Sequence, residues 1–323
     1  MQISEFLRED DTDLGKLKSL IIADVKSSND RDLLNQIYTS IHSSGLEGRV
    51  SSVLTSDTDT AKYSKALSAL VVSTAGTYEE KEAFASGYPT GYIDVATLLS
   101  GKRVSFDQII QGGDFVKRVF DKMFPFTVED AGPGEFALAA LSPQLRMRNN
   151  GDLWFKNQYI EVKASAGSGG GGRLGVTGAT LKFEKIPEIF AQFKTSDSPY
   201  GTQSFSISKL PAWINANVEP NRKRQFAEIL FGYIFGKKTP GLVAAALGNG
   251  NIVREYFAEN FYAYKKQAGW EGILLLSMRK RSALYGKNPE NFFGKVTNSS
   301  ASLNPEQDTG FAGRQILSPI ELA

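Results

Sequence analysis

The chain has 323 residues, no cysteine and a single histidine, His42. Disulfides, thiolate metal sites and multi-histidine zinc sites are therefore excluded, so any metal ion must be bound by oxygen ligands. Hydrophobic residues make up 41% and charged residues 22%, an ordinary globular composition that predicts a folded chain. No apolar run approaches the roughly 18 residues of a membrane span, and the acidic start lacks the features of a signal segment. We expect no membrane association and a cytoplasmic location.

Charge is distributed unevenly along the chain. Residues 1–112 contain 11 Lys and Arg against 16 Asp and Glu, a net charge of −5, whereas residues 113–323 contain 26 against 19, a net charge of +7. An excess of basic residues attracts a phosphate polymer. An ordinary solvated basic surface is the alternative.

The first third is predicted to be mainly helical. Apolar residues recur at helical spacing over 13–27, over 33–41 and over 60–72, and residues 46–60 are rich in loop formers. Asp30 is the expected cap of the second helix, which Gly45 ends. His42 lies beside an apolar stripe and is expected to be structural or exposed. Glycines 112 and 113 mark the predicted end of this region.

Helices and strands are mixed in the remainder. We expect a core-facing helix from Phe115, a short helix over 136–141, and strands over 153–155, 159–164, 203–208 and 272–278. Two further helices should end near Gly236 and Gly269. The tail from Leu284 is dense in Asn, Ser, Gly and Pro and is expected to be an irregular extension.

The candidate site lies in the predicted strand over 159–164. Successive side chains of a strand alternate between its two faces, so Tyr159, Glu161 and Lys163 share one face and the apolar residues between them take the other. A turn over 156–158 would return Asp152 on the preceding strand. Two carboxylates and an amine should therefore lie together.

This group suits metal-dependent phosphodiester cleavage. Paired carboxylates make a hard oxygen site for Mg²⁺ or Mn²⁺, and such an ion polarises a phosphoryl oxygen and lowers the pKa of a bound water. Lys163 could orient or deprotonate the attacking water or neutralise charge in the transition state. A phosphate-binding P-loop in the glycine-rich run is excluded, because Gly172-Arg173-Leu174 lacks the required Gly-Lys-Ser/Thr ending.

These residues resemble the motif of the PD-(D/E)XK nuclease superfamily, which has the restriction-endonuclease-like fold. The resemblance makes Asp152 the first acid, Glu161 the second acid and Lys163 the lysine, and it implies that the Val162 carbonyl is a further metal ligand. Gly151 stands at the position of the nominal proline.

Upstream and downstream features extend the resemblance. Gly132, Pro133 and Gly134 allow a tight turn before Glu135, which stands where the family often has a helical glutamate that completes the metal site. A first-turn acid favoured by the helix dipole is the alternative for Glu135. Together with the Gly-Asp and Glu-Val-Lys segments, this arrangement resembles nucleases of tailed bacteriophages. There an arginine soon after the lysine, here Arg173, would contact a phosphate.

Three further basic clusters are candidate nucleic-acid contacts that could border one groove. Each could equally be a solvated surface. The clusters are Arg146 with Arg148, Arg222 with Lys223 and Arg224, and Arg279 with Lys280 and Arg281.

The sequence thus predicts an α/β protein of the α+β type with a mixed sheet. Its expected ranges are a helical N-terminal region (1–112), a PD-(D/E)XK core (113–283) and a C-terminal extension (284–323). The expected function is that of a Mg²⁺- or Mn²⁺-dependent nuclease that hydrolyses the phosphodiester bonds of DNA. We expect it to be phage-encoded and to act in DNA processing, degradation or packaging in the cytoplasm of the infected cell. A nuclease-derived DNA-binding or virion protein without activity is the alternative, and a homo-oligomer or virion association stays open.

Overall fold

A computed structural model of the chain describes residues 28–50, 57–126, 132–147, 152–165, 172–174, 185–195, 205–294, 297–303 and 315–318. The helix predicted over 13–27 lies outside these ranges. Contacts divide the chain into two compact units, of which unit 1 comprises Met1–Gly170 and Glu271–Gly286 and unit 2 comprises Gly171–Trp270 and Lys287–Ala323. The division after Gly286 lies close to the predicted end of the second range at 283, and the predicted ranges themselves stay predictions.

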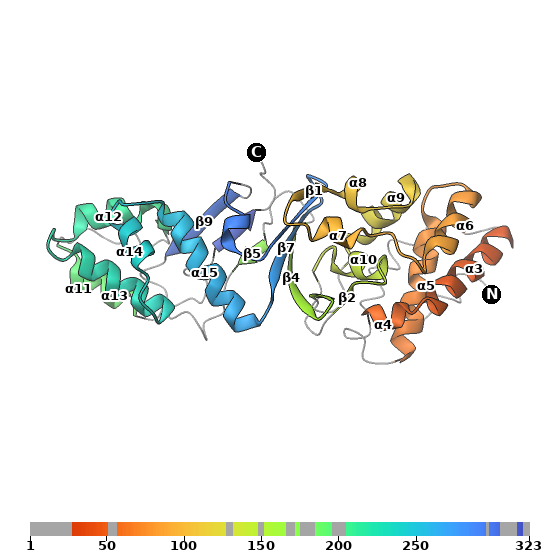
Figure 1. Ribbon diagram of the computed structural model, residues 1–323, viewed down its shortest axis with the longest axis horizontal. Helices are drawn as coiled ribbons and strands as arrows, with labels where there is room; N and C mark the ends of the chain where they lie inside the picture. The colour runs from red at the N-terminus through yellow and green to blue at the C-terminus, as the bar shows by residue number, and fades with distance from the viewer. Residues whose placement is uncertain are drawn as a thin grey trace. The chain divides into compact units, whose positions relative to one another are not determined.

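Unit 1 contains a six-stranded mixed sheet with the strand order β1-β8-β7-β4-β3-β2. Figure 1 labels β1, β7, β4 and β2 of this sheet. Only β4 and β7 pair in parallel; every other neighbouring pair of this sheet is antiparallel. The predicted mixture of helices with a mixed sheet is therefore confirmed. The strands are β1 (Arg103–Ser105), β2 (Arg146–Met147), β3 (Leu153–Phe155), β4 (Gln158–Ser165), β7 (Gly272–Ser277) and β8 (Ser282–Gly286).

The two strands that follow the Gly171–Trp270 segment of unit 2 in the chain are inner strands of this sheet. Every residue of β7 and β8 is buried, as expected for strands covered on both faces, which read as continuous apolar runs. The predicted strand over 272–278 is confirmed. Strand β8 was not predicted as part of a sheet, because its end falls in the segment expected to be irregular.

The described part of the first third (28–50 and 57–112) is mainly helical, as predicted, with two corrections. Asp30 is not a cap, because α3 already begins at Ser28. Residues 46–50 form a helix rather than a loop, since Leu46 and Val50 are both buried in the core. The helices of unit 1 are α3 (Ser28–Ser43), α4 (Leu46–Val50), α5 (Asp57–Ser73), α6 (Tyr78–Gly87), α7 (Val95–Leu98), α8 (Phe106–Ile109), α9 (Gly113–Met123) and α10 (Glu135–Ala140).

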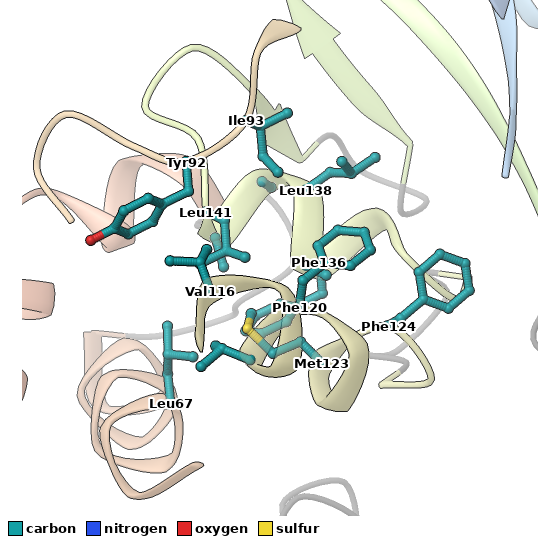
Figure 2. Packing of buried hydrophobic residues seen from close by; sticks show 14 of the residues in the cluster. Leu67, Tyr92, Ile93, Val116, Phe120, Met123, Phe124, Phe136, Leu138 and Leu141 are labelled. Atoms are coloured by element: carbon teal, nitrogen blue, oxygen red, sulfur yellow. The ribbon is translucent and has the colours of Figure 1, made fainter. Parts of the chain in front are cut away.

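One hydrophobic core joins these helices to the sheet. Figure 2 shows Leu67 of α5 near Val116 and Met123 of α9, with Phe136 of α10 on the other side of α9. The same core continues through β3 and β4 to β8. Residues before and after Gly112 therefore share one core.

The N-terminal helices also hold the end of α10. Its Ala140 carbonyl accepts hydrogen bonds from the Arg49 guanidinium at 3.0 Å and from the Tyr88 hydroxyl at 2.6 Å. Arg49 and Tyr88 are buried, and the guanidinium lies 5.0 Å from the centre of the Tyr88 ring. The carbonyls in the last turn of a helix lack partners within the helix, so these two side chains stabilise the C-terminus of α10.

Unit 2 has its own core and a four-stranded sheet with the order β5-β10-β9-β6. The predicted helices ending near Gly236 and Gly269 are confirmed, and both glycines are left-handed C-caps with φ +66° and +73°. The prediction that the tail from Leu284 is irregular is wrong in part, since β9 and β10 pair with each other. The strands are β5 (Gly172–Leu174), β6 (Phe205–Ser206), β9 (Thr297–Leu303) and β10 (Gln315–Ser318). The helices are α11 (Ile186–Phe193), η2 (Ile207–Lys209), α12 (Leu210–Asn217), α13 (Lys223–Phe235), α14 (Pro240–Ala246), α15 (Ile252–Ala268) and η3 (Pro289–Asn291).

Among the described helices, none combines the length and the apolar character needed to cross a membrane.

Gly134, which precedes α10, generates a stability prediction. Its φ is +86°, and an added Cβ would lie 2.8 Å from side-chain atoms of both Leu276 and Phe124. Gly134→Ala should lower the free energy of unfolding by about 2–5 kcal/mol, combining left-handed strain with overpacking. Gly101→Ala is the control, because Gly101 has a φ of +77° and nothing within 4 Å of the added Cβ. Urea denaturation should give about 1–2 kcal/mol for the control; equal losses would contradict the close packing at Gly134.

Candidate active site

The face of β4 that carries Glu161 is polar, as the sequence predicts. The Tyr159 hydroxyl lies 3.0 Å from Glu161 Oε2, and Lys163 Nζ forms an ion pair with Glu161 Oε1. Ile160 and Val162 are buried in the hydrophobic core of unit 1. The period of two thus separates an apolar face from a face with three polar groups in contact.

A tight hairpin brings Asp152 to this face. Lys156 and Asn157 have φ of +45° and +63°, the pair of positive values that a two-residue type I′ turn requires. Gln158 already pairs with Phe155, so the turn is shorter than the predicted 156–158. The hairpin sets Leu153 opposite Ile160, which leaves Asp152, the residue just before β3, beside the middle of β4.

Asp152 is held from two directions. Its Oδ1 accepts a hydrogen bond from the Val162 N–H at 2.9 Å, and its Oδ2 accepts one from the Tyr159 hydroxyl at 2.5 Å. The Asp152 carboxylate thus accepts a hydrogen bond from β4 just beyond the last backbone pair between β3 and β4. Because the N–H and C=O of one strand residue point toward the same neighbour, the Val162 carbonyl is also directed toward the β3 side of β4.

Glu135 approaches the same site from α10. It is the first residue of that helix and is only 5% exposed. Within the described residues its Oε2 has no hydrogen-bond partner, although the carboxyl receives a backbone hydrogen bond from Gly132. A buried polar atom without a partner is costly. If Glu135 only interacted with the dipole of its helix as a first-turn acid, its carboxyl would not need to be buried.

Burial and mutual repulsion raise the pKa of two of the carboxyls. The pKa of Glu135 lies well above its ordinary value because of desolvation and then because of the charge of Asp152. Desolvation, followed by the charge of Glu161, raises the pKa of Asp152 from 3.8 to about 6. Lys163 opposes both shifts. The single positive charge of Lys163 does not balance the negative charges that three clustered carboxyls can carry, so the site favours an additional cation.

The residues fit a divalent ion through a small set of ligands. Among the described residues, no three His, Asp or Glu side chains are close enough to hold an ion as they stand. Mg²⁺, however, commonly takes one or two carboxylates and completes its shell with water. Asp152 and Glu161, which both contact the Tyr159 hydroxyl, supply that minimal pair. Glu135 and the Val162 carbonyl are the further candidates.

The predicted nucleic-acid contacts in unit 1 differ in their surroundings. Arg146, Arg279 and Lys280 are exposed. Arg281 is instead engaged within the unit, with Nη1 2.6 Å from Asp121 Oδ2 and Nη2 3.7 Å from Asp107 Oδ1. Arg279 and Lys280 follow the end of β7, which pairs in register with the end of β4 just beyond Lys163.

The other predicted contacts belong to unit 2 or lie outside the described residues. The Arg222 guanidinium lies 4.4 Å from the centre of the Phe193 ring, Lys223 Nζ lies 2.9 Å from Asn215 Oδ1, and Arg224 is exposed. Arg173 is in β5, where only the backbone is described. Arg148 lies outside the described residues. The single groove expected from the sequence stays a prediction.

One residue of the site was missed as a functional candidate. Tyr159 contacts both Asp152 and Glu161, but sequence reasoning used it only to define a face of the strand. The signal was available, because residues 159, 161 and 163 alternate onto one face. Alternation did not indicate that the Tyr159 hydroxyl donates hydrogen bonds to Asp152 and Glu161.

Comparison of the chain with protein-family models, with curated proteins and with solved structures found no match.

The raised pKa of Asp152 generates a prediction of pH-dependent stability. Its folded pKa of about 6 exceeds the ordinary value of 3.8, so between these values the folded state binds more protons than the unfolded state, and stability falls as pH rises. Relative to Asp152→Asn, which cannot ionise, the wild type should lose about 2 kcal/mol of unfolding free energy from pH 4 to pH 7 in EDTA. Denaturation at each pH measures this difference; parallel curves for the two proteins would contradict it.

Proposed function

We propose that this protein is a divalent-metal-dependent nuclease of the PD-(D/E)XK type with a restriction-endonuclease-like core. The observation that carries the proposal is the meeting of Asp152 and Glu161, from adjacent strands, at the Tyr159 hydroxyl, with Lys163 ion-paired to Glu161. Glu135 reaches the same electrostatic cluster from a buried helix. The four residues of the sequence motif thus occur in one part of unit 1.

Each residue has a role that follows from its chemistry. Asp152 and Glu161 would hold the ion, with Glu135 and the Val162 carbonyl as additional ligands. When bound, Mg²⁺ or Mn²⁺ supplies charge stabilisation at the phosphate and a more acidic bound water. Lys163, whose side chain is 21% exposed and therefore reachable from solvent, would orient the attacking water and neutralise developing charge.

DNA is the proposed substrate, with backbone rather than base recognition. Residues 113–323 have a net charge of +7, and the exposed Arg279 and Lys280 lie beyond the end of the strand that pairs with β4. Basic side chains in such a place attract phosphates irrespective of sequence. The resemblance of the motif to nucleases of tailed bacteriophages makes an infected cell the proposed setting, with DNA processing, degradation or packaging as the proposed task.

A non-catalytic DNA-binding or virion protein is the second candidate. It is favoured by the absence, among described residues, of three metal-binding side chains in ligating positions. The hydrogen bonds and ion pair within the site would then serve stability alone. Three clustered carboxyls, of which Glu135 and Asp152 have raised pKa values, are, however, an expensive structural device compared with apolar packing, which favours the catalytic proposal.

Lys163→Met tests the catalytic proposal. With duplex and single-stranded DNA and Mg²⁺ or Mn²⁺, the variant should cut at least about 100-fold more slowly, because charge stabilisation at the transition state is lost. Lys156→Met is the matched control, since Lys156 is an exposed residue of the hairpin turn and should cut like the wild type. Circular dichroism would confirm that both variants are folded. EDTA should abolish cutting by the wild type.

Two results would overturn the mechanism: equal cutting by the wild type and Lys163→Met, or cutting that survives EDTA. An inert wild type that is abundant in purified virions by mass spectrometry would instead support the second candidate. A wild type that cuts DNA and is also present in virions would support a virion-associated nuclease.

A further inference from the structure

The Tyr159 hydroxyl lies between the two carboxylates of the site. Its oxygen is 2.5 Å from Asp152 Oδ2 and 3.0 Å from Glu161 Oε2. Those two carboxylate oxygens can therefore be no more than about 5.5 Å apart, the sum of the two distances. Two oxygens bound to one Mg²⁺ at about 2.1 Å lie roughly 3–4 Å apart, so only a small movement separates the present arrangement from a chelating one.

The position of this hydroxyl is fixed by the sheet. Tyr159 is in β4 and stands opposite Trp154 of β3 in the hairpin register. The backbone of Tyr159 is also tied to the next strand, because its carbonyl accepts a hydrogen bond from the Glu271 N–H at 2.8 Å. A tyrosine has only two side-chain torsions, so little freedom remains once its backbone is held on both sides.

The two acids would otherwise repel each other. Asp152 is 8% exposed and Glu161 is 2% exposed, so water screens their charges poorly. A phenol between them offers its proton to either acid, since its oxygen lies within hydrogen-bond distance of both. The hydroxyl thus keeps the acids together without a cation.

We propose that Tyr159 is a positioning residue that holds Asp152 and Glu161 close together, so that a divalent cation meets a preformed pair of ligands. This inference rests on the proposed nuclease function and deepens it. Groups that orient metal ligands typically contribute 10–100-fold to metal affinity. Tyr159 itself need not bind the ion or touch the substrate.

Tyr159→Phe, with Tyr285→Phe as its matched control, tests this proposal. Tyr285 lies in β8 of the same unit, is buried, and has no hydrogen-bond partner for its hydroxyl among the described residues. Mn²⁺ binding without DNA, measured by electron paramagnetic resonance, should weaken 10–100-fold in Tyr159→Phe and stay at the wild-type value in Tyr285→Phe. The cleavage rate that Tyr159→Phe loses at low Mg²⁺ should return as Mg²⁺ is raised.

A measurement on the wild type needs no substitution. Mg²⁺ should perturb the ultraviolet absorption of a tyrosine, because the surroundings of the Tyr159 hydroxyl change when its carboxylate partners take a cation. Melting curves in EDTA establish that each variant is folded before its affinity is compared. If Tyr159→Phe does not fold, the absence of this tyrosine signal in a wild type that binds Mn²⁺ overturns the proposal.

The remaining outcomes separate this proposal from the function on which it rests. Wild-type Mn²⁺ affinity in Tyr159→Phe, or equal weakening in both variants, overturns the positioning role and leaves the nuclease proposal standing. A wild type that binds no Mn²⁺ and cuts no DNA overturns both.

Discussion

The burial of acidic side chains around one lysine is the constraint on which the rest of the site depends. Carboxylates are stable in such surroundings only when donors or cations compensate them. The Val162 N–H and the Tyr159 hydroxyl serve Asp152, and Lys163 serves Glu161. All of these donors come from β4, so one strand both buries the acids and supplies most of their compensation. Glu135 is compensated least, which makes it the residue with most to gain from a cation.

The helices that precede the site in the chain help to position one of its residues, Glu135. Glu135 begins a helix of only six residues, too short to be stable by itself. Its far end is held by Arg49 and Tyr88, and its near end packs against the sheet through Gly134. The N-terminal helices are therefore part of the scaffold that aims Glu135. Their sequence carries no catalytic motif, because this contribution is made through packing and two hydrogen bonds to a backbone carbonyl.

Local signals explain which parts of the structure could be predicted from sequence. The hairpin of β3 and β4, the face of Glu161 and Lys163, and the helix ends at Gly236 and Gly269 each follow from short-range rules of alternation and capping. Helix α4 was missed because its five residues are stabilised by tertiary burial rather than by composition. The strands of the tail were missed because β9 and β10 depend on partners elsewhere in the chain. Tyr159 was missed because its importance lies in two side-chain contacts, which alternation permits but does not specify.

The parallel pairing of β4 with β7 has a consequence for biosynthesis. The two strands are separated in the chain by the whole Gly171–Trp270 segment of unit 2. At ordinary translation speeds, roughly 5–20 s pass between the emergence of the two strands from the ribosome. During that time β3 is available to pair with β4, but the edge of β4 that β7 covers in the folded protein is open. Such an edge is prone to pair with other chains, so correct folding of the newly made protein depends on β7 arriving before a competing strand does.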